Sequence, residues 1–203
     1  KQNWYCGVFA SLLNLPIFVF GALWGIMYVT QIYGLTSIEA SLICSMLFIG
    51  MIIGAPVFGF ISDKLHLRKI PMFIGVVICI LAMSFLIKST NLSFLGLAFV
   101  FYFMGFGSSA QILAYPTITE TNPLALTGSA LSLASTLIMA GGAIFQPAVG
   151  WLIESRWNGT FFGGMPLYSV ENYNVALWLI LACILISWRF AWQLRETYCR
   201  RRE

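Results

Sequence analysis

Six long apolar runs, separated by short polar breaks, constrain the fold of this chain more than any other feature. A helix needs about 20 apolar residues to cross the hydrocarbon core of a bilayer. A backbone in hydrocarbon must also satisfy its own hydrogen bonds, so runs of this length form helices rather than strands. We therefore expect an all-α, polytopic membrane protein over residues 1–203, with six transmembrane helices at about 6–32, 40–61, 70–87, 94–115, 128–153 and 175–194.

The composition excludes several classes of protein. Hydrophobic residues make up 60% of the chain and charged residues 9%, against about 45–50% and about 25% in soluble domains. Secreted, cytosolic and nucleic-acid-binding proteins are thereby excluded. The five cysteines are scattered without a C-x-x-C pair, there is one histidine, and the phosphate-binding sequence G-x-x-x-x-G-K-[ST] does not occur. We expect no metal, no cofactor and no enzymatic activity.

The positive charges predict how the helices are oriented. Nine Lys and Arg residues fall on the side that holds both termini, and two fall on the other side. Because these residues favour the cytoplasmic side, we expect both termini, including a basic tail at 195–203, in the cytoplasm, with a bacterial inner membrane as the favoured location. The nine are Lys1, Lys64, Arg68, Lys69, Arg189, Arg195, Arg200, Arg201 and Arg202, and the two are Lys88 and Arg156.

A pattern of glycine, proline and acid recurs at an offset of 91 residues. Three predicted helices separate the two copies, so one copy ends on each side of the membrane. This is typical of an inverted repeat of three helices plus three, which in transporters places the substrate between the repeats. The matched pairs are Gly50 and Gly141, Pro56 and Pro147, Gly59 and Gly150, and Asp63 and Glu154.

The densest charge follows the second run, in Gly59-Phe-Ile-Ser-Asp-Lys-Leu-His-Leu-Arg-Lys69. This Gly-x-x-x-Asp-Lys-x-x-x-Arg-Lys pattern between two spans resembles the loop motif of the major facilitator superfamily. The segment from Thr127 to Gly150 is similar to the second-last helix of that family's C-terminal half, and the resemblance extends from about Asn14 to Arg202. The sequence departs from the family where Leu65-His66-Leu67 replaces a glycine after the Asp-Lys pair.

The resemblance implies that this chain is the C-terminal six-helix half of a twelve-helix transporter. From the residues, Gly59 would let a neighbouring helix pack closely, and Asp63 lies near the N-terminal end of the next helix, which attracts an anion. Arg68 and Lys69 can pair with Asp63 or with a carboxylate of another helix. We expect these residues, with Lys64, to form a gate that closes the cytoplasmic side and breaks when that side opens.

Polar side chains inside the spans are candidates for contact with the solute, because they are costly in lipid. The resemblance implies that the first and fourth helices of each half line the central cavity. No charged residue or histidine falls in the middle third of any run, so an acid for proton coupling would lie in the other half, and a facilitator, an exchanger and a symporter all stay open. The candidates are Asn14, Trp24, Tyr28, Gln31, Gln111, Tyr115 and Gln146.

We predict secondary active transport of a small polar organic solute, which is an amino acid, a short peptide, a sugar or an organic anion. Two alternatives stay open: a non-transporting scaffold or receptor-like remnant, and a six-helix protein that dimerises to form the carrier. The expected partners are the solute, the lipid bilayer and the N-terminal half of the same transporter, with co-transported H⁺ left open and no nucleic acid.

Overall fold

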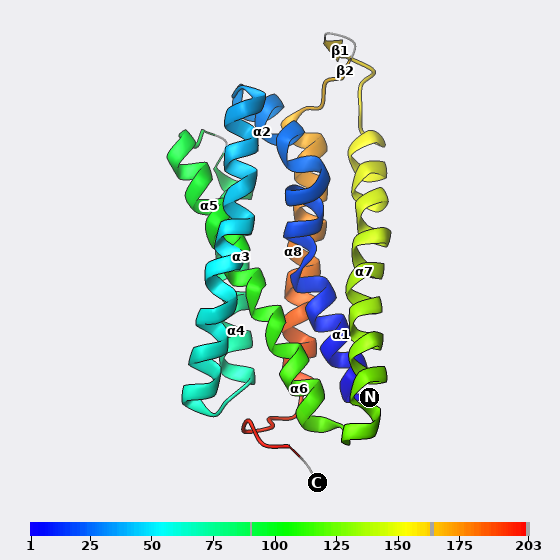
Figure 1. Cartoon of the computed structure of the whole chain (residues 1–203). Helices are drawn as coiled ribbons and strands as arrows, with labels where there is room; N and C mark the ends of the chain where they lie inside the picture. Colours follow the sequence, from blue (N-terminus) through cyan, green and yellow to red (C-terminus); the bar gives the residue numbers. More distant parts are fainter. Residues whose placement is uncertain (90, 163–164, 202–203) are drawn as a thin grey trace.

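The computed structural model describes residues 1–203 except 90, 163–164 and 202–203, so Arg202 lies outside the described residues. The described chain is helical apart from one short hairpin (Figure 1). The elements are α1 (Gln2–Leu13), a π-helical segment η1 (Ile17–Trp24), α2 (Gly25–Tyr33), α3 (Ser37–Leu65), α4 (Lys69–Lys88), α5 (Phe94–Ser108), a 3-10 segment η2 (Ser109–Leu113), α6 (Ala114–Thr121), α7 (Leu124–Glu154), strands β1 (Phe161–Phe162) and β2 (Met165–Pro166), and α8 (Val170–Gln193).

Five helical stretches of the described residues are long and apolar enough to cross a membrane. The bent pair at 2–13 and 17–33, whose axes differ by 42°, makes a sixth when the pair is counted as one span. The protein is therefore an all-α, multi-pass membrane protein, as the apolar runs predict. Several helices overrun those runs: α3 begins at Ser37 rather than near 40, because the side chains of Thr36 and Glu39 form a capping box that satisfies its first N–H groups.

The helices lie side by side and turn at the two ends of a bundle (Figure 1). One end, the termini end, holds both chain termini and the turns after α3 and α6. The other, the hairpin end, holds β1, β2 and the turns after α2 and α4. Lys64 in the last turn of α3 and Arg156 just beyond α7 therefore lie at opposite ends, which agrees with the predicted distribution of charge.

Two helix contacts are related by the offset seen in the sequence. α3 packs against α5, and α7 packs against α1. A Cβ atom at Gly50 would collide with the carbonyl oxygen of Tyr102, and one at Gly141 would collide with Oγ of Ser11. Gly50 and Gly141 are 91 residues apart, and so are Ser11 and Tyr102. An inverted repeat requires this relationship, and the repeat itself stays a prediction.

The first and fourth spans are both interrupted near mid-length. The first span widens into the π-helical η1 after Asn14, and the fourth tightens into the 3-10 segment η2. At the offset of 91, residues 109–113 of η2 correspond to 18–22 within η1. Irregular backbone inside a membrane is tolerated where it is buried in protein or lines a cavity, and in transporters it marks the region of the solute site.

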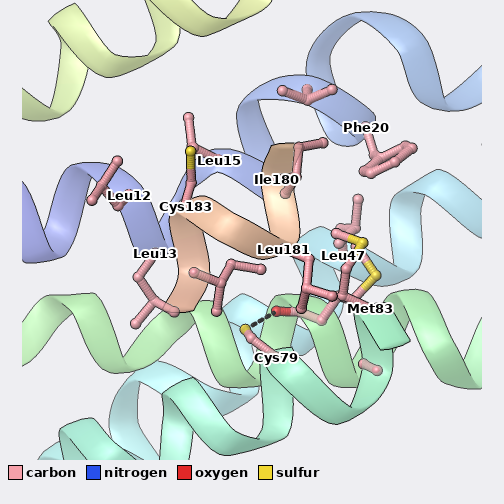
Figure 2. Close-up of a cluster of buried hydrophobic side chains, with 14 of the residues drawn as sticks. Leu12, Leu13, Leu15, Phe20, Leu47, Cys79, Met83, Ile180, Leu181 and Cys183 are labelled. Atoms are coloured by element: carbon pink, nitrogen blue, oxygen red, sulfur yellow. Dashed lines mark hydrogen bonds between the residues drawn. The ribbon is translucent and has the colours of Figure 1, made fainter. Parts of the chain in front are cut away.

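An apolar core surrounds these interruptions. Figure 2 shows Leu13 of α1, Phe20 of η1, Leu47 of α3, Met83 of α4 and Ile180 of α8 gathered in one cluster, and all five side chains are buried. The core therefore ties the interrupted first span to α3, α4 and α8, and it holds the irregular backbone in place.

Candidate functional site

At the termini end, Arg68 is the centre of a network of hydrogen bonds. Its Nη2 lies 2.6 Å from Oε1 of Glu120, and its Nε lies 3.2 Å from the same oxygen. Nη1 donates to Oδ1 of Asp63 at 2.6 Å and to Oγ of Ser62 at 2.9 Å. The side chains of Arg68 and Glu120 are 8% and 11% exposed, whereas that of Asp63 is 68% exposed. The loop after α3 is thus tied to the fourth span by a pair largely removed from water.

A second carboxylate holds the backbone at the start of α4. The two oxygens of Glu196 accept hydrogen bonds from the backbone N–H groups of Arg68 at 2.7 Å and Lys69 at 3.0 Å. A carboxylate there satisfies donors that the first turn of a helix leaves unpaired, and the helix dipole favours its charge. The hydroxyl of Thr197 donates to Glu120. The segment after α8 therefore joins α4 to α6.

The network keeps Arg68 charged. Burial lowers the pKa of Arg68, but the hydrogen bonds to Glu120 and Asp63 raise it by more, so its pKa lies above the ordinary value. The neighbouring Cys199 donates to the carbonyl of Ser62 at 3.6 Å, and burial raises the pKa of its thiol. Because an arginine with a raised pKa stays protonated at every physiological pH, the network does not open through loss of the charge on Arg68.

The turn between α3 and α4 depends on a left-handed residue. His66 ends α3 with a φ of 53°, a conformation that costs a residue with a side chain about 1–2 kcal/mol and that glycine adopts freely. His66 is one of the three residues that stand where the resembled motif has a glycine. The turn also lets Oγ of Ser62 donate to the carbonyl of Leu67 at 2.8 Å, which brings Arg68 back beside α3.

Gly59 does not provide the close packing that we expected within this chain. A Cβ atom at Gly59 would meet no atom within 4 Å among the described residues. α3 instead approaches the fourth span through Gly50 and Gly54, where an added Cβ would collide with atoms of Tyr102 and Ser109. Gly59 is five residues beyond Gly54, which turns it to a different face of the helix.

The side chains of the two lysines of the predicted gate lie outside the Arg68 network. Lys64 is exposed, and its Nζ lies 6.0 Å from the centre of the Phe60 ring. Nζ of Lys69 donates to the backbone carbonyl of Trp192 at 2.9 Å and lies 5.8 Å from the centre of the Trp192 side-chain ring. Of the predicted gate residues, the structure thus joins Asp63 and Arg68 directly, and it connects Lys69 to α8.

Two predicted solute contacts face each other in the middle of the bundle. Nε2 of Gln111 donates to Oδ1 of Asn14 at 2.7 Å, and both residues are 6% exposed. Asn14 stands at the break between α1 and η1, and Gln111 lies in η2, so the pair joins the two interrupted spans. Together with Tyr115 they line a cavity of about 200 Å³. The amides offer donors and acceptors without charge, which suits a neutral polar solute.

The other four predicted contacts lie elsewhere. Nε2 of Gln146 donates to the carbonyl of Phe18 at 2.9 Å, which satisfies a backbone group of η1. Tyr28 is buried among aromatic rings toward the hairpin end. The indole N–H of Trp24 is buried and has no partner among the described residues. Gln31 binds the loop between α7 and α8 and does not reach the central cavity.

Two residues of the charge network were not singled out from the sequence. The sequence predicts that Arg68 meets a carboxylate of a neighbouring helix, and Glu120 is the residue that does so. Glu196 follows the last apolar run, in the tail at 195–203, and only the basic residues of that tail entered the prediction. Position in the sequence could have identified Glu120 and Glu196 as partners of Arg68, because the charge pattern places both acids at the same end of the bundle as Arg68.

Comparisons with known proteins add the family and the fold. A family model described as Major Facilitator Superfamily matches residues 6–193. A solved structure of the proton:xylose symporter XylE, bound to 6-bromo-6-deoxy-D-glucose, matches with a TM-score of 0.75 at 13% sequence identity. The match covers 97% of this chain and 45% of the symporter chain, so this chain spans less than half the length of that protein. No curated protein matches the sequence.

Proposed function

We propose a specific transport function for this chain, because it belongs to the major facilitator superfamily. In this proposal the chain is the C-terminal half of a secondary active transporter that moves a small, neutral, polyhydroxylated solute of sugar size by alternating access. The shared fold with a proton:xylose symporter supports this class of solute, and the 45% coverage of that symporter supports the pairing with a second six-helix half.

The observation that carries the proposal is the buried pair of Asn14 and Gln111. It lies where the first and fourth spans are interrupted, beside a cavity that Tyr115 also lines. Buried polar groups in a membrane are costly and are kept where they serve a function. Amide and hydroxyl groups bind the hydroxyls of a neutral solute. No charged side chain lines the cavity among the described residues, which disfavours an ionic solute.

The network around Arg68 serves as the gate at the termini end. Its pair with Glu120 is buried, so separating the two groups is costly unless water or another partner replaces the lost contacts. A ligand shifts such an equilibrium only by its difference in affinity for the two states. Solute bound at Asn14 and Gln111 can supply that difference, because Gln111 lies on the same span as Glu120.

The termini end faces the cytoplasm in this proposal, because the Lys and Arg residues concentrate there. The two six-helix halves rock against each other around the solute, and the 3+3 inverted repeat within this half is part of the proposal. XylE is a proton symporter by its description, and we assign any acid for proton coupling here to the other half.

Uptake measurements test this function. The full-length protein that contains this chain is reconstituted into liposomes, and uptake of labelled D-xylose and D-glucose is measured with and without an inward proton gradient. We expect saturable uptake that Gln111→Ala lowers at least about tenfold, which corresponds to about 1.4 kcal/mol. A gradient that accelerates uptake identifies a symporter.

A matched variant controls for loss of folding. Gln193→Ala removes an amide at the end of α8, far from the cavity lining, and should leave uptake unchanged. Uptake of amino acids or anions but not of sugars would overturn the solute class. Equal uptake by the wild type and Gln111→Ala would overturn the assigned site.

A further inference from the structure

At the hairpin end, Gln31 makes two hydrogen bonds to the loop between α7 and α8 and a third to Tyr173 of α8. Its Nε2 donates to the carbonyl of Pro166 at 2.8 Å. Its Oε1 accepts from the backbone N–H of Tyr168 at 3.1 Å and from the hydroxyl of Tyr173 at 3.1 Å. These bonds hold the loop between α7 and α8 against the end of the first span, and they leave one N–H of the amide available.

The loop, Gln31 and the start of α8 line an open pocket of about 340 Å³ that is separate from the central cavity. This volume falls within the range of about 300–1,000 Å³ that small-molecule sites occupy. No charged side chain lines it among the described residues, and six of its lining residues carry amide or hydroxyl groups. These six are Gln31, Asn158, Thr160, Tyr168, Ser169 and Asn172.

Some polar groups of this lining already form hydrogen bonds within the protein, and others do not. Ser169 and Asn172 bind each other in the capping box of α8. The hydroxyl of Thr160 donates to a backbone carbonyl of the same loop at 3.2 Å. The amide of Asn158 and the hydroxyl of Tyr168 make no hydrogen bond with the described residues. An amide and a phenol are thus free to bind a ligand beside the spare N–H of Gln31.

Aromatic rings stand beside these polar groups. The ring of Tyr168 lies 6.0 Å from that of Trp157 and 5.9 Å from that of Tyr173, centre to centre. Of these three rings, that of Tyr168 lines the pocket. It offers apolar contact area, while amides and hydroxyls fix orientation. A neutral ring with several hydroxyls matches this combination. A charged solute would lose its hydration without gaining a counter-charge.

We infer that this hairpin-end cavity is a second solute site, which binds a neutral monosaccharide before it reaches Asn14 and Gln111. The class of solute rests on the proposed function. The first span connects the two sites, since Asn14 stands at its break and Gln31 near its end. The site also gives Gln31 a role that the central cavity does not.

Protection of an introduced thiol measures occupancy of this site directly. Val170→Cys, at a lining position that is 37% exposed and carries no polar group, is made in the full-length protein with Cys199→Ser, because the other four cysteines of this chain are buried. The thiol is labelled with a membrane-impermeant methanethiosulfonate reagent at increasing D-glucose or D-xylose. At ten times the dissociation constant, labelling should slow about elevenfold. Arg156→Cys, exposed at the same end but outside the lining, is the matched control and should show no protection.

The outcomes separate this inference from the proposed function. Unchanged labelling of Val170→Cys in either sugar, with sugar uptake intact, overturns the second site and leaves the transport function standing. Protection that disappears in Gln111→Ala shows that the central site closed the loop from a distance, which also overturns it. Protection that persists in Gln111→Ala supports a separate site, even where sugar uptake is lost.

Discussion

The guanidinium of Arg68 and the carboxylate of Glu120 form a buried ion pair across 52 residues of sequence, with Nη2 2.6 Å from Oε1. Asp63 also contacts Arg68 but is 68% exposed. Breaking a buried pair by removing one partner costs about 3–5 kcal/mol, whereas an exposed pair contributes at most about 1 kcal/mol. Glu120 rather than Asp63 therefore dominates the energy of the Arg68 network.

Neutralising Glu120 should open the termini end far more than neutralising Asp63. Cys199 reports the opening, because its thiol lies within the network. In the full-length protein, we expect Glu120→Gln to raise the rate of maleimide labelling of Cys199 at least about tenfold, which corresponds to about 1.4 kcal/mol. Asp63→Asn should raise it by less than about fivefold, as expected for an exposed pair. Equal effects of the two substitutions would mean that the buried pair does not control this end.

The amide pair of Asn14 and Gln111 should matter more for transport than for stability. Hydrogen bonds between membrane helices contribute about 0.6 kcal/mol on average and at most about 1.7 kcal/mol. A double-mutant cycle with Asn14→Ala and Gln111→Ala, followed by thermal unfolding in detergent, should give a coupling energy in that range. Each single variant should lower sugar uptake at least about tenfold. A large coupling energy with unchanged uptake would assign the pair a structural role only.

Much of the fold follows from the sequence, while the pairing of side chains depends on tertiary structure. The apolar runs are sufficient for six spans because lipid leaves the backbone no alternative to helix. The sequence does not identify Glu120 as the partner of Arg68, because two helical spans separate the residues and their packing brings the two side chains together. One separation could have been predicted: Asn14 and Gln31 are 17 residues apart on one span, or about 25 Å at about 1.5 Å per residue, too far to share one small solute.

A leucine should be tolerated at Gly59 and not at Gly50. Gly50 lies against the backbone of Tyr102, while a Cβ at Gly59 would meet nothing within 4 Å. Overpacking costs about 1–3 kcal/mol or more, and a substitution on an open face changes stability by about 0.5 kcal/mol or less. We expect Gly59→Leu to leave the thermal unfolding temperature unchanged and Gly50→Leu to lower it strongly. A similar loss in both variants would show that Gly59 has a close neighbour after all.

Replacing His66 with glycine should stabilise the turn between α3 and α4. His66 adopts a φ of 53° and is exposed, so its side chain contributes strain without burial. Removing the Cβ relieves about 1–2 kcal/mol in the folded state, and the greater freedom of glycine in the unfolded chain cancels about 0.4–1 kcal/mol of that gain. We expect His66→Gly to raise the unfolding temperature slightly and to leave sugar uptake unchanged. His66→Ala is the matched control, because it removes the imidazole but keeps the Cβ, and it should bring no gain in stability. A gain of equal size in His66→Ala would assign the strain to the imidazole rather than to the backbone conformation.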